Sequence, residues 1–427
     1  MSIDLIIRGA KCVSHRGIEN SDIAVRDGII VAIGQFVDVK ADHIINGDGL
    51  HILPGLIDSD FQFTDQVETV ETGTKAALMG GVTSIISKSK DATNQEIWCD
   101  HGYFEQACKA NIDKLDTLER QEGCAGIYLT MANINDQEAI TDDKSLLKVM
   151  ENGDRRVVVH AEDQQRLDQR LSFIEKDHVS SHAVWRDQKV ALNGTRRILA
   201  IARAGGRRVH LAHISTENEM AMVAANKDIA TLSVSPIHLS FASEDCYDHY
   251  GNYAQTDPPI REENNRLGLY KAISGAIVDM LGSHHNAQSI AQKEQQYPLS
   301  TSGIPSVQTM LPLMLNHVNN GVFSLQTLMD LTSAGPARIF NIANKGRLAV
   351  GYDADFTLID LKKKWILEDD DVMSGCGWDL SAGQQFTGKV IGTMVRGHMA
   401  MWNGEITKEA TGKPLKFTDT FRAFEKE

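Results

Sequence analysis

The stretch HILPGLIDSDFQ (residues 51–62) decides the fold class, because a buried apolar run ends directly in polar residues. Similar apolar runs recur along the chain, at GVTSIIS (81–87), AGIYLTM (125–131), RRVVVH (155–160), RRVHLAH (207–213), ATLSVS (230–235) and AIVDMLGS (276–283). Amphipathic stretches separate most of them. Near-continuous apolar runs are typical of buried parallel strands, and the spacing suits a strand followed by a crossover helix. The pattern predicts an α/β fold with a (β/α)8 barrel over residues 52–345. A doubly wound sheet is the alternative, but no GxGxxG follows the early strands.

Both ends of the chain are rich in β-strand signals. Asp27-Gly28 and Asn403-Gly404 each lie between apolar runs, which is typical of tight hairpin turns. We therefore expect residues 1–51 and 346–410 to build one small β-sandwich-like domain, and residues 411–427 to form a C-terminal tail whose end, FRAFEKE, is frayed.

One link in the predicted barrel is too short. Only ten residues (88–97) separate Ser87 from the next candidate strand, WCDHGYF (98–104). A parallel crossover normally needs a dozen or more residues. Either one barrel helix is missing between the second and third strands, or residues 97–111 are themselves the helix and a strand is lost.

The composition excludes several classes of function. The chain has 43 Lys and Arg against 57 Asp and Glu, a net charge of −14, which argues against binding nucleic acid. It has no apolar run of 18 residues and opens directly on a strand-like segment, so we expect neither a membrane span nor a signal peptide. The 6 cysteines form no CxxC pair, which indicates reduced thiols in a cytoplasmic protein.

The chemistry of a barrel lies at the carboxyl ends of its strands. The residues at these positions are Asp58, Asp60, Gln62, Lys88, Lys90, Tyr128, His160, His213, His284 and His285. With 15 histidines in the chain, a metal site is chemically possible if they are correctly placed.

The chain resembles a known family, the cyclic-amide branch of the amidohydrolase superfamily. This branch contains the class I dihydroorotases, dihydropyrimidinases and allantoinases. The resemblance spans nearly the whole chain. It rests on HILPGLID, GGVTSII, HAEDQQRL, SSHAVWRDQ, RRVHLAHIST, DPPIRE, SGIPSVQTMLPLM, LTSAGPARIFNIANKGRLAVGYDADFTLIDL and VRGHMAMWNGEI. It implies the barrel and composite β-domain predicted above, and a site with one or two zinc ions.

Most of the ligand positions that the resemblance implies are replaced. The HxH pair after the first strand reads Asp60-Phe61-Gln62, and the carboxylated lysine after the fourth strand is Tyr128. His160 and His213 match the two single histidine ligands. The aspartate that takes a proton from the metal-bound water becomes His284.

The substrate contacts that the resemblance implies change as well. The carboxylate-binding arginine falls on Thr64, and one substrate-binding asparagine falls on Lys90. The asparagine before the double proline becomes Asp257, whereas Arg261 is retained. We therefore interpret the chain as a dihydroorotase-like pseudoenzyme that most simply holds no cofactor.

A catalytic alternative stays open. Asp60, His160, His213 and His284 could together hold a single zinc or another divalent ion, with Asp60 or Asp257 as the base. Arg261 and Asp257 would then bind substrate.

The simplest interpretation of these residues is structural. His160 and His213 would be hydrogen-bonded core residues, Asp60 would pair with one of them or with Lys88, and Tyr128 would fill space. Histidines 101, 178, 182 and 249 are predicted to be solvated, as is the acidic run at 368–371.

If the chain lacks chemistry, its function must lie in contacts. The resemblance offers metal-free dihydroorotase-like subunits that scaffold aspartate transcarbamoylase, and homo-oligomeric adaptors. We therefore expect a homo-oligomer, and a partner enzyme of pyrimidine metabolism.

Overall fold

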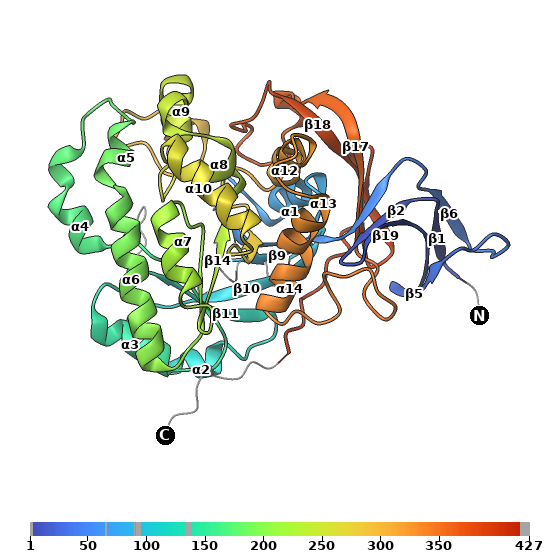
Figure 1. Cartoon of the computed structure of the whole chain (residues 1–427), viewed down its shortest axis with the longest axis horizontal. Helices are drawn as coiled ribbons and strands as arrows, with labels where there is room; N and C mark the ends of the chain where they lie inside the picture. The colour runs from blue at the N-terminus through green and yellow to red at the C-terminus, as the bar shows by residue number, and fades with distance from the viewer. Residues whose placement is uncertain (1–2, 65, 89, 91–94, 134–138, 419–427) are drawn as a thin grey trace.

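The computed structural model describes residues 3–64, 66–88, 90, 95–133 and 139–418. Within them a closed barrel of parallel strands occupies one side of the molecule (Figure 1). Its strands are β8 (Leu56–Gln62), β9 (Val82–Ser87), β10 (Asp100–Gln106), β11 (Cys124–Thr130), β12 (Val157–His160), β13 (Val209–Leu211), β14 (Ala230–Val234) and a last strand in two pieces, β15 (Met280–Leu281) and β16 (His285–Asn286). β15 pairs with β14 and β16 pairs with β8, so the last strand closes the barrel. The prediction of a (β/α)8 barrel is confirmed.

Helices cover the outside of the barrel. Between the strands lie α1 (Val70–Met79), α2 (Leu115–Leu118), α3 (Asp143–Glu151), α4 (Gln164–Gln169), α5 (Ser181–Trp185), α6 (Gln188–Gly205), α7 (Glu217–Ala224), α8 (Pro236–Ser240), α9 (Ser243–Tyr250) and α10 (Glu263–Ser274). After the last strand come α11 (Ile290–Lys293), α12 (Met310–Asn319), α13 (Leu325–Met329), a π-helical turn (Asp330–Ala334) and α14 (Gly335–Ile339). Short 3-10 turns lie at Ile112–Lys114, Leu171–Phe173, Gly251–Ala254 and Asp369–Asp371.

The sequence encodes the ends of α6, which is the longest of these helices. The side chain of Asp187 accepts a hydrogen bond from the N–H group of Val190 at the first turn. Gly206 ends the helix in the left-handed conformation, at φ +67°, which glycine adopts without steric cost.

The link between β9 and β10 has no helix among its described residues, 88, 90 and 95–99. Because β10 is a strand, the second of the two alternatives is wrong, and the described residues of the link show no helix, as the first alternative expects. Residues 411–418 of the predicted C-terminal tail pack here instead, whereas its end, FRAFEKE, lies outside the described residues. The N–H group of His101 donates to the carbonyl of Lys413 (3.0 Å), and that of Leu415 donates to the carbonyl of His101 (2.8 Å). The side chain of Leu415 is buried.

Segments from both ends of the chain form two further sheets beside the barrel (Figure 1). The four-stranded sheet has the order β5-β4-β1-β6, from β1 (Leu5–Arg8), β4 (Asp22–Arg26), β5 (Ile29–Gly34) and β6 (His43–Asn46). The seven-stranded sheet has the order β20-β19-β18-β17-β7-β2-β3, from β2 (Lys11–Ser14), β3 (Gly17–Asn20), β7 (His51–Pro54), β17 (Phe356–Ile366), β18 (Gln385–Val395), β19 (His398–Trp402) and β20 (Glu405–Ile406).

Two hairpins in these sheets turn where the sequence predicts. Asp27-Gly28 joins β4 to β5 and Asn403-Gly404 joins β19 to β20, and all four residues have positive φ. Positive φ at both central positions is the mark of a type I′ turn.

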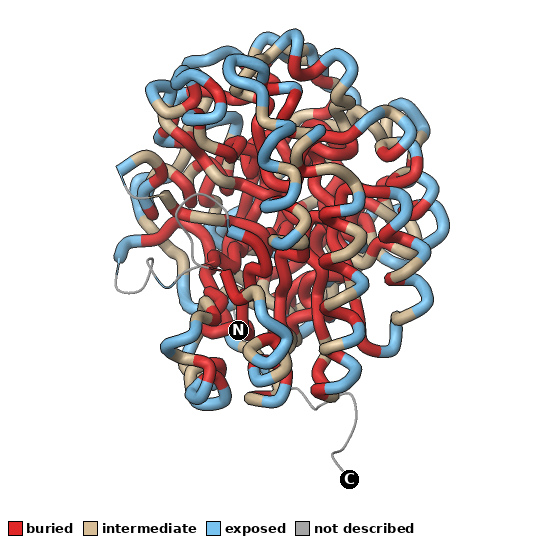
Figure 2. Tube along the Cα trace, turned by 90° about the vertical axis from the view of Figure 1, so that its left-hand side faces the viewer, coloured by how far each residue is buried: buried red, intermediate tan, exposed pale blue. Residues whose placement is uncertain are grey.

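Burial is greatest along the axis of the barrel and falls toward the outer helices (Figure 2). Apolar side chains of the strands meet those of the surrounding helices in one large buried cluster. In the described part of the chain, no helix has both the length and the apolar character that crossing a membrane requires. The polar residues at the strand ends are therefore held by a tightly packed core.

Candidate active site at the barrel mouth

Asp60 lies at the centre of the barrel mouth, at the carboxyl end of β8. Its Oδ1 atom lies 3.0 Å from the Nζ atom of Lys88, which follows β9. Its Oδ2 atom accepts a hydrogen bond from Nδ1 of His213, which follows β13, over 2.8 Å. Both partners were predicted alternatives for Asp60, and the structure brings both to the same carboxylate.

The polar chain continues through the two histidines. Nε2 of His213 lies 2.7 Å from Nδ1 of His160, and Nε2 of His160 lies 2.8 Å from Oε2 of Glu162. Glu162 also binds the guanidinium of Arg186. All of these side chains are buried. Each ring nitrogen of both histidines therefore already faces a protein atom.

His284 completes the inner group. Its ring stacks on that of His213, with the centroids 4.1 Å apart and the planes 17° from parallel. One ligand atom each from Asp60, His213 and His284 lie within 4.8 Å of one another. His160, the fourth predicted ligand, does not belong to this group and lies behind His213.

The charged groups at the mouth shift the pKa values of one another. Burial alone would raise the pKa of Asp60, but the Lys88 ammonium and the nearby histidines hold that pKa well below its usual value. Burial opposes protonation of Lys88, yet Asp60 and Tyr128 raise the pKa of Lys88 overall. Burial and the adjacent His213 lower the pKa of His284. Asp60 and Lys88 thus form a buried ion pair beside neutral imidazoles.

A second ion-pair cluster lies beside the first. Asp257 Oδ1 lies 3.0 Å from Nε of Arg186 and 2.8 Å from Nε2 of His182. His182 is only 2% exposed, so the prediction that it is solvated is wrong. The same prediction is wrong for His101, which is buried against Ser87. It holds for His178 and His249, which are exposed.

The retained arginine, Arg261, does not reach the mouth. Its side chain is buried, and it donates to Ser215 Oγ (3.1 Å) and to the carbonyl of Arg186. Among the described residues, its Nη2 atom has no hydrogen-bond partner. Arg261 therefore braces the loop that carries Arg186.

The cavity at the mouth is small. Its volume is about 20 Å³, and its lining residues are Gln62, Lys88, Tyr128, His160, His213, Thr256, Asp257, His284, Asn286, Ser302 and Gly303. One water molecule needs about this much space. A larger ligand can enter only if the loops around the mouth move apart.

Three other predicted positions do not line the mouth cavity. The ammonium of Lys90 donates to Gln121 Oε1 (2.6 Å), and Thr64 Oγ1 lies 3.5 Å from Asn286 Oδ1. His285 points away from the mouth, with Nε2 at 3.0 Å from Glu68 Oε2.

Sequence reasoning did not single out Glu162 or Arg186. Both lie inside stretches that carry the family resemblance, HAEDQQRL and SSHAVWRDQ, and this was the available signal. Their importance becomes visible only when the loops after β12 and β14 meet over the barrel.

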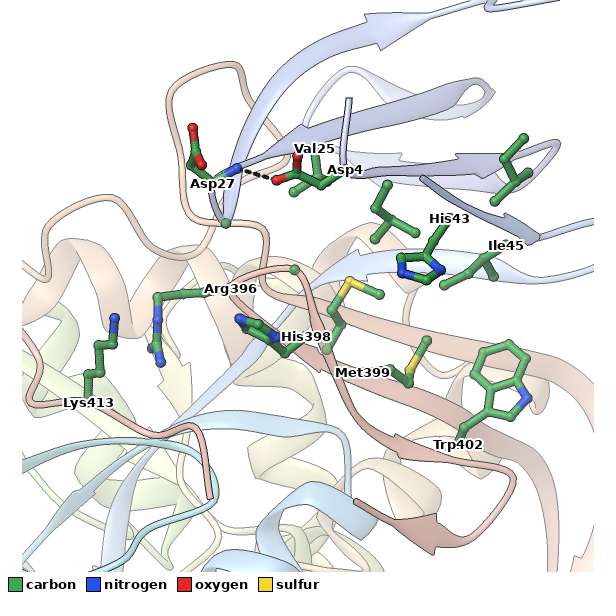
Figure 3. A pocket seen from close by; sticks show the side chains of 15 residues that line it. Asp4, Val25, Asp27, His43, Ile45, Arg396, His398, Met399, Trp402 and Lys413 are labelled. Atoms are coloured by element: carbon green, nitrogen blue, oxygen red, sulfur yellow. Dashed lines mark hydrogen bonds between the residues drawn. The ribbon is translucent and has the colours of Figure 1, made fainter. Parts of the chain in front are cut away.

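Two other features of the molecule could be taken for sites. Asp100, Asp353 and Asp355 converge, but the ammonium of Lys345 lies among them, at 3.0 Å from Asp353 Oδ2. A larger cavity of about 970 Å³ lies between the two outer sheets (Figure 3). Its most basic residue, Arg396, is bound to Asp100. Neither feature joins the polar network of the mouth.

Comparison with known proteins agrees with this geometry. The sequence profile of the amidohydrolase family matches residues 51–400. The chain belongs to the amidohydrolase family. It is 25% identical to a dihydroorotase of Methanosphaera stadtmanae over 434 residues, covering 95% of this chain and 98% of the relative. It is 28% identical to an allantoinase of Desulfitobacterium hafniense over 445 residues, covering 97% and 98%.

Solved structures show the same fold for this amidohydrolase. The L-hydantoinase (dihydropyrimidinase) of Arthrobacter aurescens superposes with a TM-score of 0.90 at 24% identity, covering 98% of this chain and 100% of that one. A D-hydantoinase from Bacillus sp. AR9 superposes with a TM-score of 0.87 at 24% identity, covering 99% and 100%. The barrel with its flanking sheets is therefore the architecture of hydantoinases.

The number of ligand atoms at the mouth is sufficient for one metal ion, but the charge of the group suits such an ion only in part. Asp60, His213 and His284 supply the three protein ligands that a catalytic zinc ion uses, and a bound ion would activate water. However, the carboxylate of this group is already bound to an ammonium, and Tyr128 stands where the resemblance implies a carboxylated lysine. A second ion finds no comparable donor group among the described mouth residues.

Proposed function

We propose that this amidohydrolase is a binding or scaffolding member of the cyclic-amide branch, without metal-dependent hydrolysis. The observation that carries the proposal is the buried ion pair between Lys88 and Asp60. The ammonium supplies the positive charge that Asp60 would otherwise take from a metal ion. Adding a divalent cation beside a buried ammonium would cost free energy, since the group offers a single carboxylate to balance both.

The hydrogen bonds of the two histidines that match the resemblance support the same proposal. His160 and His213 bind each other and two carboxylates, as core histidines do. To ligate an ion through these nitrogens, the rings would first have to give up existing hydrogen bonds. The mouth cavity also has room for only one water molecule in this conformation.

A second candidate function is hydrolysis at a rebuilt site with one metal ion. One observation favours it: the contacts Asp60–His213, His213–His160 and His160–Glu162 need three protons, whereas two neutral imidazoles provide two. A cation at one ring nitrogen, or a third proton, would satisfy the remaining contact. The convergence of Asp60, His213 and His284 gives such a cation a place to bind.

Metal content decides between the two candidates. The protein is purified without chelators and incubated with zinc, manganese or ferrous iron, and bound metal is measured by mass spectrometry. Ring opening of dihydroorotate, hydantoin and allantoin is assayed in parallel. We expect less than about a tenth of an equivalent of metal, and no ring opening above the uncatalysed rate.

Stoichiometric metal together with ring opening would overturn the proposal in favour of the second candidate. A His213→Ala variant then has to lose the metal if the mouth holds it. His249→Ala, which changes an exposed histidine, is the matched control and should retain it.

A scaffolding function requires a partner. We propose a homo-oligomer, and an enzyme of pyrimidine metabolism as the partner, because one relative is a dihydroorotase. Light scattering of the chain alone, and of the chain mixed with aspartate transcarbamoylase, measures both associations. A monomer that leaves the mass of the added enzyme unchanged would contradict this role.

A further inference from the structure

Lys293, the last residue of α11, is buried without a carboxylate partner. Its side chain is 0% exposed. Its Nζ atom donates to three backbone carbonyls, those of Gln255 (3.0 Å), Thr301 (3.1 Å) and Gly303 (3.0 Å). Among the described residues, no carboxylate oxygen lies within 4 Å of this ammonium. An ammonium has three N–H donors, so the three carbonyls use all of them.

The three carbonyls belong to two loops that wall the barrel mouth. Thr256 and Asp257 follow Gln255, and Ser302 precedes Gly303; all four line the mouth cavity. The loops also bind each other, since the N–H group of Gly303 donates to the carbonyl of Gln255 (2.9 Å). Lys293 therefore lies behind the wall of the cavity and ties its two loops together.

The loop at Gly303 has no space to settle closer. Gly303 has φ +142°, and a side chain there would start 2.5 Å from the carbonyl oxygen of Asn286, the end of the last barrel strand. The loop is packed against the barrel on one side and held by Lys293 on the other. A change at Lys293 can therefore loosen this loop, but it cannot bring the loop closer to the barrel.

The surroundings of Lys293 determine how easily it loses its proton. Burial is the main cause that lowers the pKa of Lys293, to about 7, while the Asp257 carboxylate and the Cys376 thiol act in the opposite direction. Asp257 is itself paired with Arg186 and His182, and burial keeps Cys376 protonated by raising its pKa to about 11.

The other neighbours of Lys293 add little to this balance. The ring of Trp378 lies 5.7 Å from Nζ. Glu294, the next residue along the chain, turns to the hydroxyl of Tyr253 (3.5 Å). The ammonium and the amine of Lys293 thus interconvert close to neutral pH.

We propose that Lys293 is a proton-controlled clamp that holds the barrel mouth closed and releases one of its two loops at alkaline pH. The neutral amine keeps two N–H donors and turns a lone pair toward the third carbonyl, which repels it. Since the closed cavity has room for only one water molecule, loosening of these loops is the step that admits a larger ligand. The clamp operates whether or not the mouth holds a metal ion, so its failure and that of the proposed function are distinguishable.

Hydrogen–deuterium exchange of the two loops tests the clamp. Peptides covering residues 252–260 and 298–306 are compared at pH 6 and pH 8.5, after correction for the intrinsic exchange rate. We expect the protection of the Gly303 amide to fall about tenfold between these values in the native protein. Peptides from α6 should keep their protection.

Two variants make the test specific. In Lys293→Met the loops should be poorly protected at both pH values, because no ammonium is present. Lys271→Met removes an exposed lysine, whose side chain is 75% exposed, and should retain the native response. If Lys293→Met does not fold, the pH dependence of exchange in the native protein alone tests the clamp. Equal protection at pH 6 and pH 8.5 would overturn the clamp, as would an unchanged response in Lys293→Met.

Discussion

The Nδ1 atom of His160 lies 2.7 Å from the Nε2 atom of His213, so the two histidines that the resemblance predicts as metal ligands bind each other. Each ring turns its other nitrogen to a carboxylate, Glu162 for His160 and Asp60 for His213. The two rings and two acids form one hydrogen-bonded row across the mouth, which ends at Lys88. Lys88 is therefore the residue at which the proposed exclusion of metal can be tested.

Replacing Lys88 by methionine should increase the affinity for zinc. The variant leaves the Asp60 carboxylate without its ammonium, so Asp60, His213 and His284 can ligate a cation at no cost in charge repulsion. We expect zinc to bind at least about tenfold more tightly than to the native protein, as measured by calorimetry.

Lys90→Met is the matched control for this change. Lys90 follows the same strand, but its ammonium points to Gln121, so the variant should bind zinc as the native protein does. Equal zinc affinity in Lys88→Met and the native protein would show that the ammonium is not what excludes the ion.

Removing the guanidinium of Arg186 should destabilise the fold strongly. Arg186 is 3% exposed and pairs with both Glu162 and Asp257, so Arg186→Met leaves two buried carboxylates without the guanidinium that they share. We expect the free energy of unfolding, from urea denaturation, to fall by about 3–5 kcal/mol.

Arg166→Met serves as the comparison for Arg186, because Arg166 makes its ion pair with Asp187 at a partly exposed position. Its loss should cost under about 1 kcal/mol. Similar losses of unfolding free energy in the two variants would mean that the buried Arg186 cluster stabilises the fold no more than a partly exposed ion pair does.

Acid should destabilise the protein through its buried neutral histidines. Burial lowers the pKa of His210 to about 3, with Arg156 as a further cause. The unfolded chain has an ordinary histidine, so it binds the proton between about pH 6.5 and pH 3 while the folded chain does not. Stability therefore falls as the pH falls through this window, by up to about 1.4 kcal/mol per unit for this residue.

Urea denaturation between pH 7 and pH 4 measures that slope. His210→Phe should show a shallower decline than the native protein, whereas His178→Gln, at an exposed position, should follow the native curve. Parallel curves for the native protein and His210→Phe would contradict the assignment.

The segment at 411–418 should contribute to the stability of the barrel. Leu415→Ala removes a side chain that is 2% exposed and packs in the cluster behind β10. We expect a loss of about 2–5 kcal/mol in the free energy of unfolding. Lys416→Ala, one residue on and exposed, should change it by less than about 0.5 kcal/mol. Native-like stability of Leu415→Ala would show that the segment packs only loosely.

The fold was predictable because its signals are local. Apolar runs mark the strands, and Asp27-Gly28 and Asn403-Gly404 mark turns that need positive φ. The short link after Ser87 correctly indicated an irregular barrel. What covers the gap could not be predicted, since Pro414 and His101 meet across most of the chain and no local pattern links them.

The sequence could predict that three of the four candidate ligand residues converge, but not which side chains they bind. Asp60, His213 and His284 follow strand ends, and the barrel topology brings strand ends together. His182 and Arg186 were not found, because helical and loop positions look solvated until a loop from elsewhere covers them. The partner of each, Asp257, lies more than 70 residues further along the chain.

The packing of residues 411–418 on β10 also sets an order of events during synthesis. The backbone of Lys413 binds the side chain of Asp100 across 313 residues. At about 5–20 residues per second, a ribosome needs roughly 15–60 s to deliver one after the other. Throughout that interval the third barrel strand can pair with its barrel neighbours but lacks the contacts that this segment makes with it, so those contacts can form only after the rest of the barrel has been made.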